Sequence, residues 1–213
     1  MKMTLVYDNT LYRKDLQPDW GFACYIETEK KPTVLFDTGA NGAILLRNME
    51  KLGIYPATTD IVVISHAHWD HTGGLAELLK VNDTASLYVP ASFCPSFPGR
   101  EVIVVRQALQ ISENIFLTGE LMGMEQSLVV KTEKGLVVIA GCSHPGVGPI
   151  LQAASRYGEV YALIGGLHGF SEFDLIKDIQ QVCACHCTQH QSEIKKLYPE
   201  KWVEGGVGKV IVI

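Results

Sequence analysis

Three of the seven histidines of this chain stand within six positions, in the stretch HAHWDH at residues 66–71. A buried imidazole needs a hydrogen-bond partner, so a cluster of histidines is costly in a core unless it binds something. Imidazole nitrogens, together with the carboxylate of Asp70, are ligands that suit zinc and also manganese or iron. The stretch therefore predicts a metal site. In the alternative interpretation, Asp70 caps a helix and the histidines are solvated loop residues.

The place of this cluster along the chain favours two metal ions. A short apolar run predicts a buried strand at residues 60–65, which ends just before the cluster. While the chain stays extended, His66 and His68 project to the same side, because side chains alternate along a strand. Asp70 and His71 follow where the chain turns, and they point elsewhere. This arrangement suits two neighbouring ions, one bound by each pair of residues.

The elements that must position this cluster alternate between strands and helices. Strand patterns cover residues 3–9, 21–28, 31–40 (ending in a turn at 37–39), 60–65, 85–93, 101–107, 127–141 (a hairpin), 161–166 and 208–213. Helical patterns cover residues 41–54, 73–82, 149–158, 173–182 and 191–202. Sheets with helix-covered faces are therefore expected. We find no internal repeat and no low-complexity linker, which predicts one domain over residues 1–213.

Composition excludes several classes of protein. Of the 213 residues, 47% are hydrophobic and 19% charged, which is typical of a well-buried globular domain. No apolar run approaches the roughly 18 residues of a membrane span, and the first residues do not resemble a secretory signal. The net charge of −5, without a long basic run, disfavours nucleic acid as a partner. We therefore expect a cytoplasmic protein that acts on a small molecule, and a homo-oligomer stays open.

The six cysteines are expected to be reduced, because a chain of this size without an export signal does not need a disulfide framework. They divide into a dispersed group and a cluster: Cys24, Cys94 and Cys142, then Cys183, Cys185 and Cys187. If the cluster lies on a strand, its three thiols share one face as small buried hydrophobic groups, and His186 shares the opposite face with Ala184. The alternative is a redox cluster of the three thiols.

These residues resemble a known family. The pattern HxHxDH after a buried strand is similar to the signature of the metallo-β-lactamase fold superfamily, and the upstream LFDTG matches as well. The blocks SHAHWDHTGGL, FLTGEL, GLVVIAGCSHPGV, IGGLHG and CHCT resemble, in order, those of the 7,8-dihydropterin-6-methyl-4-(β-D-ribofuranosyl)aminobenzene-5'-phosphate synthase-like branch. The chain departs from that branch at Gln189, where glycine is usual, and in DWGFACY, which lacks an early histidine. The resemblance implies an α/β fold, the four-layer αββα sandwich.

The resemblance also implies a set of metal ligands. Two further histidines complete it, one from GCSHPGVG and one from CHCT, so that the expected ligands are His66, His68, Asp70, His71, His144 and His186. By this assignment His144 joins the first pair and His186 the second. Asp37 in LFDTG resembles the acidic residue that supports the metal loop from behind the ligands.

Two positions near these ligands keep alternatives open. Asp70 and His168 in IGGLHG are both assigned catalytic roles. For His168 the possible roles are a contact to the second metal, a proton donor or a phosphate binder. The bridging aspartate that is usual in the superfamily has no evident counterpart, because the matching turn contains Cys142. The bridge is then left to water or to an unidentified ligand, with Cys142 as one candidate. His190 is expected at the surface.

The expected function follows from a pair of divalent metal ions, zinc first, with manganese, magnesium or iron as alternatives. Such a pair lowers the pKa of a bound water and clamps charged oxygens. We therefore predict a binuclear metal-dependent hydrolase-like enzyme that attacks a small phosphorylated or ester-type metabolite through a metal-bound hydroxide. The alternatives are a pterin-related transferase that releases diphosphate and a non-catalytic metal-containing sensor. A diiron redox enzyme is disfavoured by His68 and by the short chain.

Overall fold

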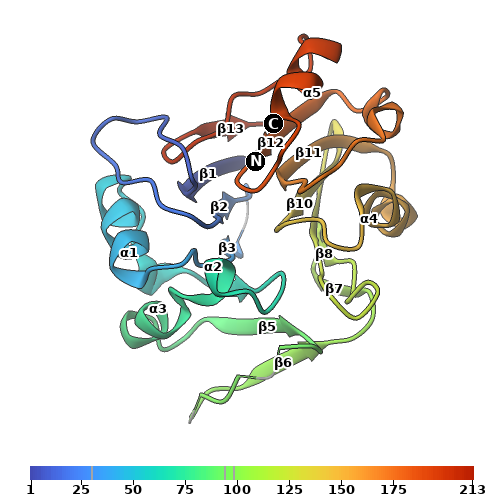
Figure 1. Ribbon diagram of the computed structural model, residues 1–213. Helices are drawn as coiled ribbons and strands as arrows, with labels where there is room; N and C mark the ends of the chain where they lie inside the picture. Colours follow the sequence, from blue (N-terminus) through green and yellow to red (C-terminus); the bar gives the residue numbers. More distant parts are fainter. Residues whose placement is uncertain (30, 94, 98) are drawn as a thin grey trace.

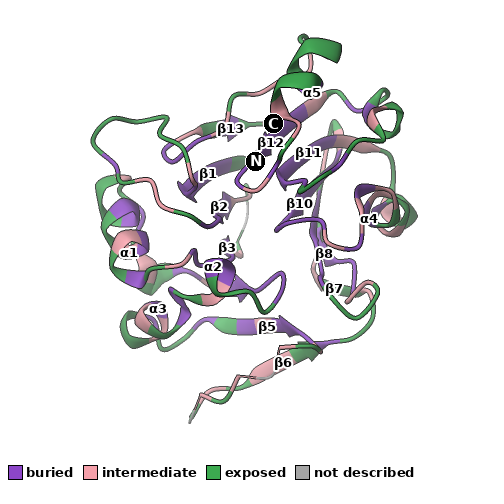
Figure 2. Ribbon diagram, in the orientation of Figure 1, coloured by how far each residue is buried: buried purple, intermediate pink, exposed green. Residues whose placement is uncertain are grey.

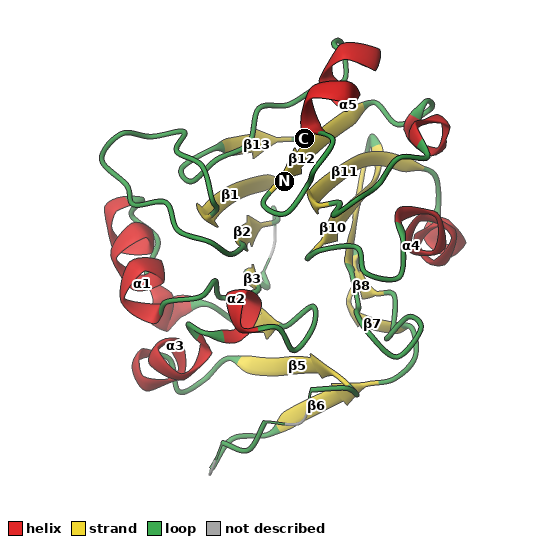
Figure 3. Cartoon of the chain, viewed as in Figure 1, coloured by secondary structure: helices red, strands yellow, loops and turns green. Residues whose placement is uncertain are grey.

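Two β-sheets lie face to face, and helices cover the outer face of each (Figures 1 and 3). The computed structural model describes residues 1–29, 31–93, 95–97 and 99–213. The first sheet has the order β13-β1-β2-β3-β4-β5-β6, formed by β13 (Val210–Val212), β1 (Lys2–Tyr7), β2 (Ala23–Glu27), β3 (Val34–Phe36), β4 (Ile61–Val63), β5 (Ser86–Pro90) and β6 (Val102–Val105). The second has the order β12-β11-β10-β9-β8-β7, formed by β12 (Gln181–Cys185), β11 (Val160–Gly166), β10 (Gly135–Ala140), β9 (Leu128–Thr132), β8 (Ile115–Leu117) and β7 (Leu109–Ser112).

Helices cover the sheets from both sides (Figure 1). The α-helices are α1 (Gly42–Lys51), α2 (Trp69–Thr72), α3 (Leu75–Val81), α4 (Val147–Ala154) and α5 (Gln191–Leu197), and the 3-10 turns are η1 (Pro56–Thr58), η2 (Ser155–Tyr157) and η3 (Phe173–Ile176). The side chain of Asn41 caps α1 by accepting from the first free backbone N–H groups. Gly53, with φ of +71°, follows its end, as the sequence indicates. No helix in the described part of the chain is long and apolar enough to span a lipid bilayer.

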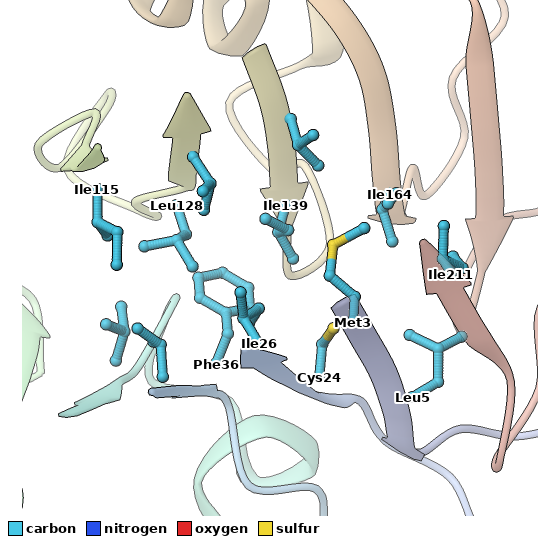
Figure 4. Packing of buried hydrophobic residues seen from close by; sticks show 14 of the residues in the cluster. Met3, Leu5, Cys24, Ile26, Phe36, Ile115, Leu128, Ile139, Ile164 and Ile211 are labelled. Carbon is cyan, nitrogen blue, oxygen red and sulfur yellow. The ribbon is translucent and has the colours of Figure 1, made fainter. Parts of the chain in front are cut away.

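Apolar side chains fill three layers, which confirms the predicted αββα sandwich. The layer between the sheets includes Met3, Leu5, Cys24, Ile26 and Phe36 from the first sheet, and Figure 4 shows them facing Ile115, Leu128, Ile139 and Ile164 of the second. A second layer packs α1 and α3 against the first sheet, and a third packs α4, η3 and α5 against the second. Figure 2 shows that the buried residues run along the strands of both sheets.

Strand β10 shows how the sequence produces this layering. Its run of apolar residues is buried on both faces, which is typical of a strand inside a sandwich. Val137 and Ile139 point into the layer between the sheets, whereas Leu136 and Val138 point into the layer under α4. Side chains alternate along a strand, so one apolar run serves two cores.

The prediction of a helix at residues 173–182 is wrong. Only a 3-10 turn forms at Phe173–Ile176, and Gln181 already begins β12. Ile176 and Ile179 are buried against the second sheet without a continuous helix. Val182 pairs with Leu163 in a parallel ladder, so pairing with β11 overrides the helical spacing of the segment. The hairpin of β7 and β8 was not predicted at all, because its strands are short and β7 is largely exposed.

Candidate metal centre

The histidine cluster lies at an edge where parallel strands of both sheets end. β3 and β4 are parallel neighbours, and so are β10, β11 and β12. The carboxyl ends of parallel strands meet at one edge of a sheet, and the loops there commonly carry functional groups. These loops carry every predicted site residue: Asp37 after β3, then His66, His68, Asp70 and His71 after β4, His144 after β10, His168 after β11 and His186 after β12.

Backbone strain gathers in the same loops. Five non-glycine residues have positive φ in the described part of the chain, and four of them follow these strands: Asp37, Ser143, His168 and His186, with φ of 61°, 62°, 47° and 50°. A left-handed conformation is unfavourable for residues with a side chain, and it persists where the surrounding structure fixes it. Such strain is typical of sites whose side chains must be aimed in a set direction.

The first group of candidate ligands combines two loops. His66 Nε2 lies 3.1 Å from His68 Nδ1. The ring centroid of His144 lies 4.7 Å from that of His66 and 4.8 Å from that of His68. Tetrahedral zinc with Zn–N bonds of about 2.0–2.1 Å separates its ligand nitrogens by about 3.3 Å. Among the described residues, His144 Nε2 is buried without a hydrogen-bond partner. We call these three residues the first trio.

The second group combines α2 with the loop after β12. His186 Nε2 lies 3.4 Å from Asp70 Oδ2, and His71 Nε2 lies 3.8 Å from the same oxygen. His186 is almost fully buried, and its Nε2 also lacks a hydrogen-bond partner within the described chain. A buried ring nitrogen without a partner is costly unless a ligand completes it. We call Asp70, His71 and His186 the second trio.

Burial leaves several of these side chains in the protonation states that cation binding would require. It lowers the pKa of His66, His71 and His144, so these imidazoles are neutral and keep a free lone pair at pH 7. Burial also disfavours the ionised form of Asp70, but the nearby rings of His186 and His71 outweigh it and lower the pKa of Asp70. Neutral imidazole and ionised carboxylate are the forms that metals require.

Asp37 holds His71 from behind. One oxygen accepts the backbone N–H of Ser65 at 2.7 Å, and the other lies 2.7 Å from both Ser65 Oγ and His71 Nδ1. Burial raises the pKa of Asp37 to about 8, although the hydrogen bonds from Ser65 act in the opposite direction. Ser65 Oγ also lies 2.9 Å from Nδ1 of His66. Asp37 and Ser65 thereby orient one ring of each trio so that its Nε2 faces the cluster.

The substitution Asp37→Ala is expected to weaken metal affinity by about 10–100-fold, because groups that orient a ligand ring contribute effects of that size. Competition with a chromophoric chelator measures the affinity. The exposed Asp178 provides the matched control, since Asp178→Ala removes the same carboxylate from the surface. An affinity for the Asp37→Ala protein equal to that of the control would show that Asp37 does not support the ligands.

His186 is held by two residues that the sequence analysis missed. Asn9 Oδ1 lies 3.0 Å from His186 Nδ1, and the Asn9 amide donates to the His186 carbonyl at 3.0 Å. Asp8 accepts the His186 backbone N–H at 2.9 Å. These contacts fix the left-handed backbone and direct Nε2 toward Asp70. The available signal was a polar Asp-Asn pair directly after the apolar strand β1.

Glu125 is a fully buried residue that the sequence analysis missed. Its Oε1 accepts the backbone N–H groups of Gly141, Cys142 and Ser143 at 2.9, 3.0 and 3.1 Å, and Oε2 accepts that of His144 at 2.9 Å. Burial raises the pKa of Glu125, and these backbone hydrogen bonds oppose that rise. One carboxylate therefore sets the loop that carries His144. The signal was a glutamate in the polar run before β9.

The cysteines follow their predicted pattern only in part. Cys183 and Cys185 share the face of β12 that packs between the sheets, as expected. The strand ends at Cys185, however, so Cys187 does not continue that face. Cys187 is half-buried beside the candidate metal ligands instead, with its Sγ 4.0 Å from the carbonyl oxygen of Cys142. The described cysteines are all free thiols, and Cys94 lies outside the described residues.

His168 and Trp20 border the two trios on different sides. His168 is exposed, and its ring centroid lies 5.2 Å from that of His144, on the side of the first trio. Trp20, which was not predicted, donates from Nε1 to Asp70 Oδ2 at 2.9 Å. Its half-exposed indole also lies 5.5 Å from the His186 ring. His190 lies outside the site, paired with Glu193 at 3.3 Å.

The fold and these loops define a class of protein. Residues 21–148 match the metallo-beta-lactamase superfamily, and the chain belongs to this superfamily. The crystal structure of Tm1679, described as a metal-dependent hydrolase of the beta-lactamase superfamily, has a TM-score of 0.76 at 24% identity and covers 100% of this chain and 99% of its own. That likeness shows the fold.

Two relatives by sequence carry names of different activities. The 7,8-dihydropterin-6-methyl-4-(beta-D-ribofuranosyl)-aminobenzene-5'-phosphate synthase of Methanocaldococcus jannaschii is 26% identical over 278 residues, covering 98% of this chain and 95% of the relative. Ribonuclease Z of Aeropyrum pernix is 34% identical over 106 residues, covering 49% of this chain and 30% of the relative. The similarity to a pterin synthase over nearly the whole chain agrees with the resemblance seen in the motifs.

Proposed function

We propose that this protein is a binuclear metal-dependent hydrolase-like enzyme that acts on a small phosphorylated or ester-type metabolite. The observation that carries the proposal is the pair of buried Nε2 atoms, on His144 and His186, that lack a hydrogen-bond partner in the described chain while lying close to other candidate ligand atoms. Each belongs to a trio whose ligand atoms lie within 4.8 Å of one another. The donor set of imidazoles and one carboxylate suits zinc first, and manganese or iron as well.

Each trio would hold one cation, the first through three imidazoles and the second through Asp70, His71 and His186. Bound divalent cations supply Lewis acidity, which activates water and polarises phosphoryl or carbonyl oxygens. The protein's own contribution is orientation. Asp37, Ser65 and Asn9 fix ligand rings from behind, so that little reorganisation is needed when the site is filled.

Two polar side chains near the trios would handle the substrate. The exposed ring of His168, beside the first trio, is placed to donate a hydrogen bond or a proton to a substrate oxygen that gains charge. Trp20 holds Asp70 through its indole N–H, and its exposed ring forms a wall beside the second trio. We assign His168 as proton donor and Trp20 as the residue that positions Asp70.

A second candidate function is a pterin-related transferase that releases diphosphate. The observation that favours it is the synthase named above, which is similar over 98% of this chain. In that reaction an aryl acceptor takes the place of water. The two candidates therefore differ in what the purified enzyme consumes.

Assays of the zinc, manganese, magnesium and iron forms test the proposal. Phosphodiester, lactone and thioester substrates are expected to be hydrolysed by at least one form, and chelation is expected to abolish turnover. The transferase would instead release diphosphate only when an aryl acceptor is present. Metal-loaded protein that binds ligands but turns over nothing in any assay would contradict both and favour a sensor.

A further inference from the structure

The sulfur of Cys142 lies between the two trios. Its Sγ is 3.2 Å from Nε2 of His71, a member of the second trio. The sulfur also forms a group with His66 and His71 whose ligand atoms all lie within 4.8 Å of one another, and His66 belongs to the first trio. A further group places the sulfur within 4.8 Å of a ring nitrogen of His186. The thiol therefore faces ligand atoms of both trios at once.

The surrounding structure fixes this sulfur in place. The N–H of Cys142 donates to Glu125, and the residue is only 3% exposed. A Cβ on the preceding Gly141 would lie 2.2 Å from Ser65 Oγ and 3.2 Å from Asp37 Oδ2. The loop thus packs directly against the two residues that orient the histidine rings, and only glycine permits that approach. A thiol held this closely to metal-facing nitrogens is positioned as a ligand, not as a filler of the core.

We propose that Cys142 binds the metal pair as a thiolate placed between both ions, an inference that rests on the proposed binuclear function. On binding, the thiol proton passes to solvent, a sulfur–metal bond replaces the S–H bond, and no electrons are transferred. A thiolate is a softer ligand than a carboxylate or water, and it selects zinc or iron over magnesium or manganese. With this thiolate the site would favour zinc or iron, and Cys142 would take the place of the bridging aspartate that is not evident in the sequence.

Cys187 provides a matched control within the same site. Its Sγ shares a ligand group with Cys142 and His186, but that group includes neither His66 nor His71. Among these groups, Cys187 is therefore placed with a member of the second trio but with no member of the first. If proximity of any thiol were sufficient, the two cysteines would behave alike.

Cobalt(II) reports a bound thiolate directly, through a sulfur-to-metal charge-transfer band in the near ultraviolet. The wild-type protein and Cys187→Ser are expected to bind two cobalt ions and show the band. Cys142→Ser is expected to lose the band, and its zinc-to-manganese affinity ratio is expected to fall by at least about 10-fold. Cys142→Asp, which keeps a ligand at this position, is expected to bind two cobalt ions without the band and covers the case in which Cys142→Ser does not fold.

Metal analysis of the same samples separates the two proposals. Wild-type protein that binds no cobalt contradicts the binuclear function itself. Wild-type protein that binds two cobalt ions without the band contradicts only the proposed Cys142 thiolate, and the assignment of the two trios as ligands is unaffected. A band that survives in Cys142→Ser or Cys142→Asp, or that disappears in Cys187→Ser, assigns the sulfur elsewhere and overturns the inference.

Discussion

Replacing Glu125 with alanine is expected to lower the free energy of unfolding of the metal-free protein by about 3–5 kcal/mol. The carboxylate is the acceptor for four successive backbone N–H groups, from Gly141 to His144. Each buried N–H left without an acceptor costs about 1–3 kcal/mol. The substitution also removes a buried charge, and this gain offsets only part of the total cost of the four unpaired N–H groups. Urea denaturation of the metal-free protein measures the change.

The substitution Glu125→Gln refines this prediction. Its amide oxygen still accepts the N–H groups of Gly141, Cys142 and Ser143, whereas its NH₂ group faces the N–H of His144, a second donor. We therefore expect a smaller loss of stability and a displaced His144, with weaker binding of the first ion. Glu133, exposed in the β9–β10 turn, is the control, and Glu133→Ala should change stability by less than about 0.5 kcal/mol. Equal stabilities for Glu125→Ala and this control would contradict the role of Glu125.

The substitution Asp70→Asn is expected to reduce metal content from two ions to one and to lower turnover by more than about 100-fold. Loss of a group that only supports a ligand weakens a metal site by about 10–100-fold, and loss of the ligand itself exceeds that. Asp70 is the single carboxylate of the second trio, and its Oδ2 faces both His71 and His186. Metal analysis by mass spectrometry and hydrolysis of bis(p-nitrophenyl) phosphate measure the two effects.

Two further variants test whether the effect of Asp70→Asn comes from loss of the Asp70 carboxylate as a ligand. Trp20→Phe keeps the ring beside His186 but removes the N–H that donates to Asp70, so it should still bind two ions when metal is in excess, with metal affinity lower by about 10–100-fold. Asp83→Asn changes an exposed aspartate and should match the wild type. Asp70→Asn protein that still holds two ions at wild-type affinity would remove Asp70 from the ligand set.

Much of the fold was predictable because each pattern has a local physical cause. The apolar runs of β4 and β10 and the spacing of α1 follow from alternation and helical periodicity. The segment after Phe173 was not predictable in this way, because its apolar residues satisfy the helical period while β11 offers a ladder partner. A pattern in a short stretch of sequence holds no information about a strand that is distant in the sequence but pairs with that stretch in the sheet.

The types of candidate ligand can be read from the amino-acid sequence, since HAHWDH, GCSHPGVG and CHCT contain the six residues that form the two trios. The residues that support these ligands come together only through the packing of the folded chain. Glu125, Asn9 and Trp20 act through contacts with residues 16 to 177 positions away, and no short motif records such contacts. The position of Cys142 between the trios has the same origin: the close approach of the β10 loop to Asp37 and Ser65 depends on two sheets packed face to face.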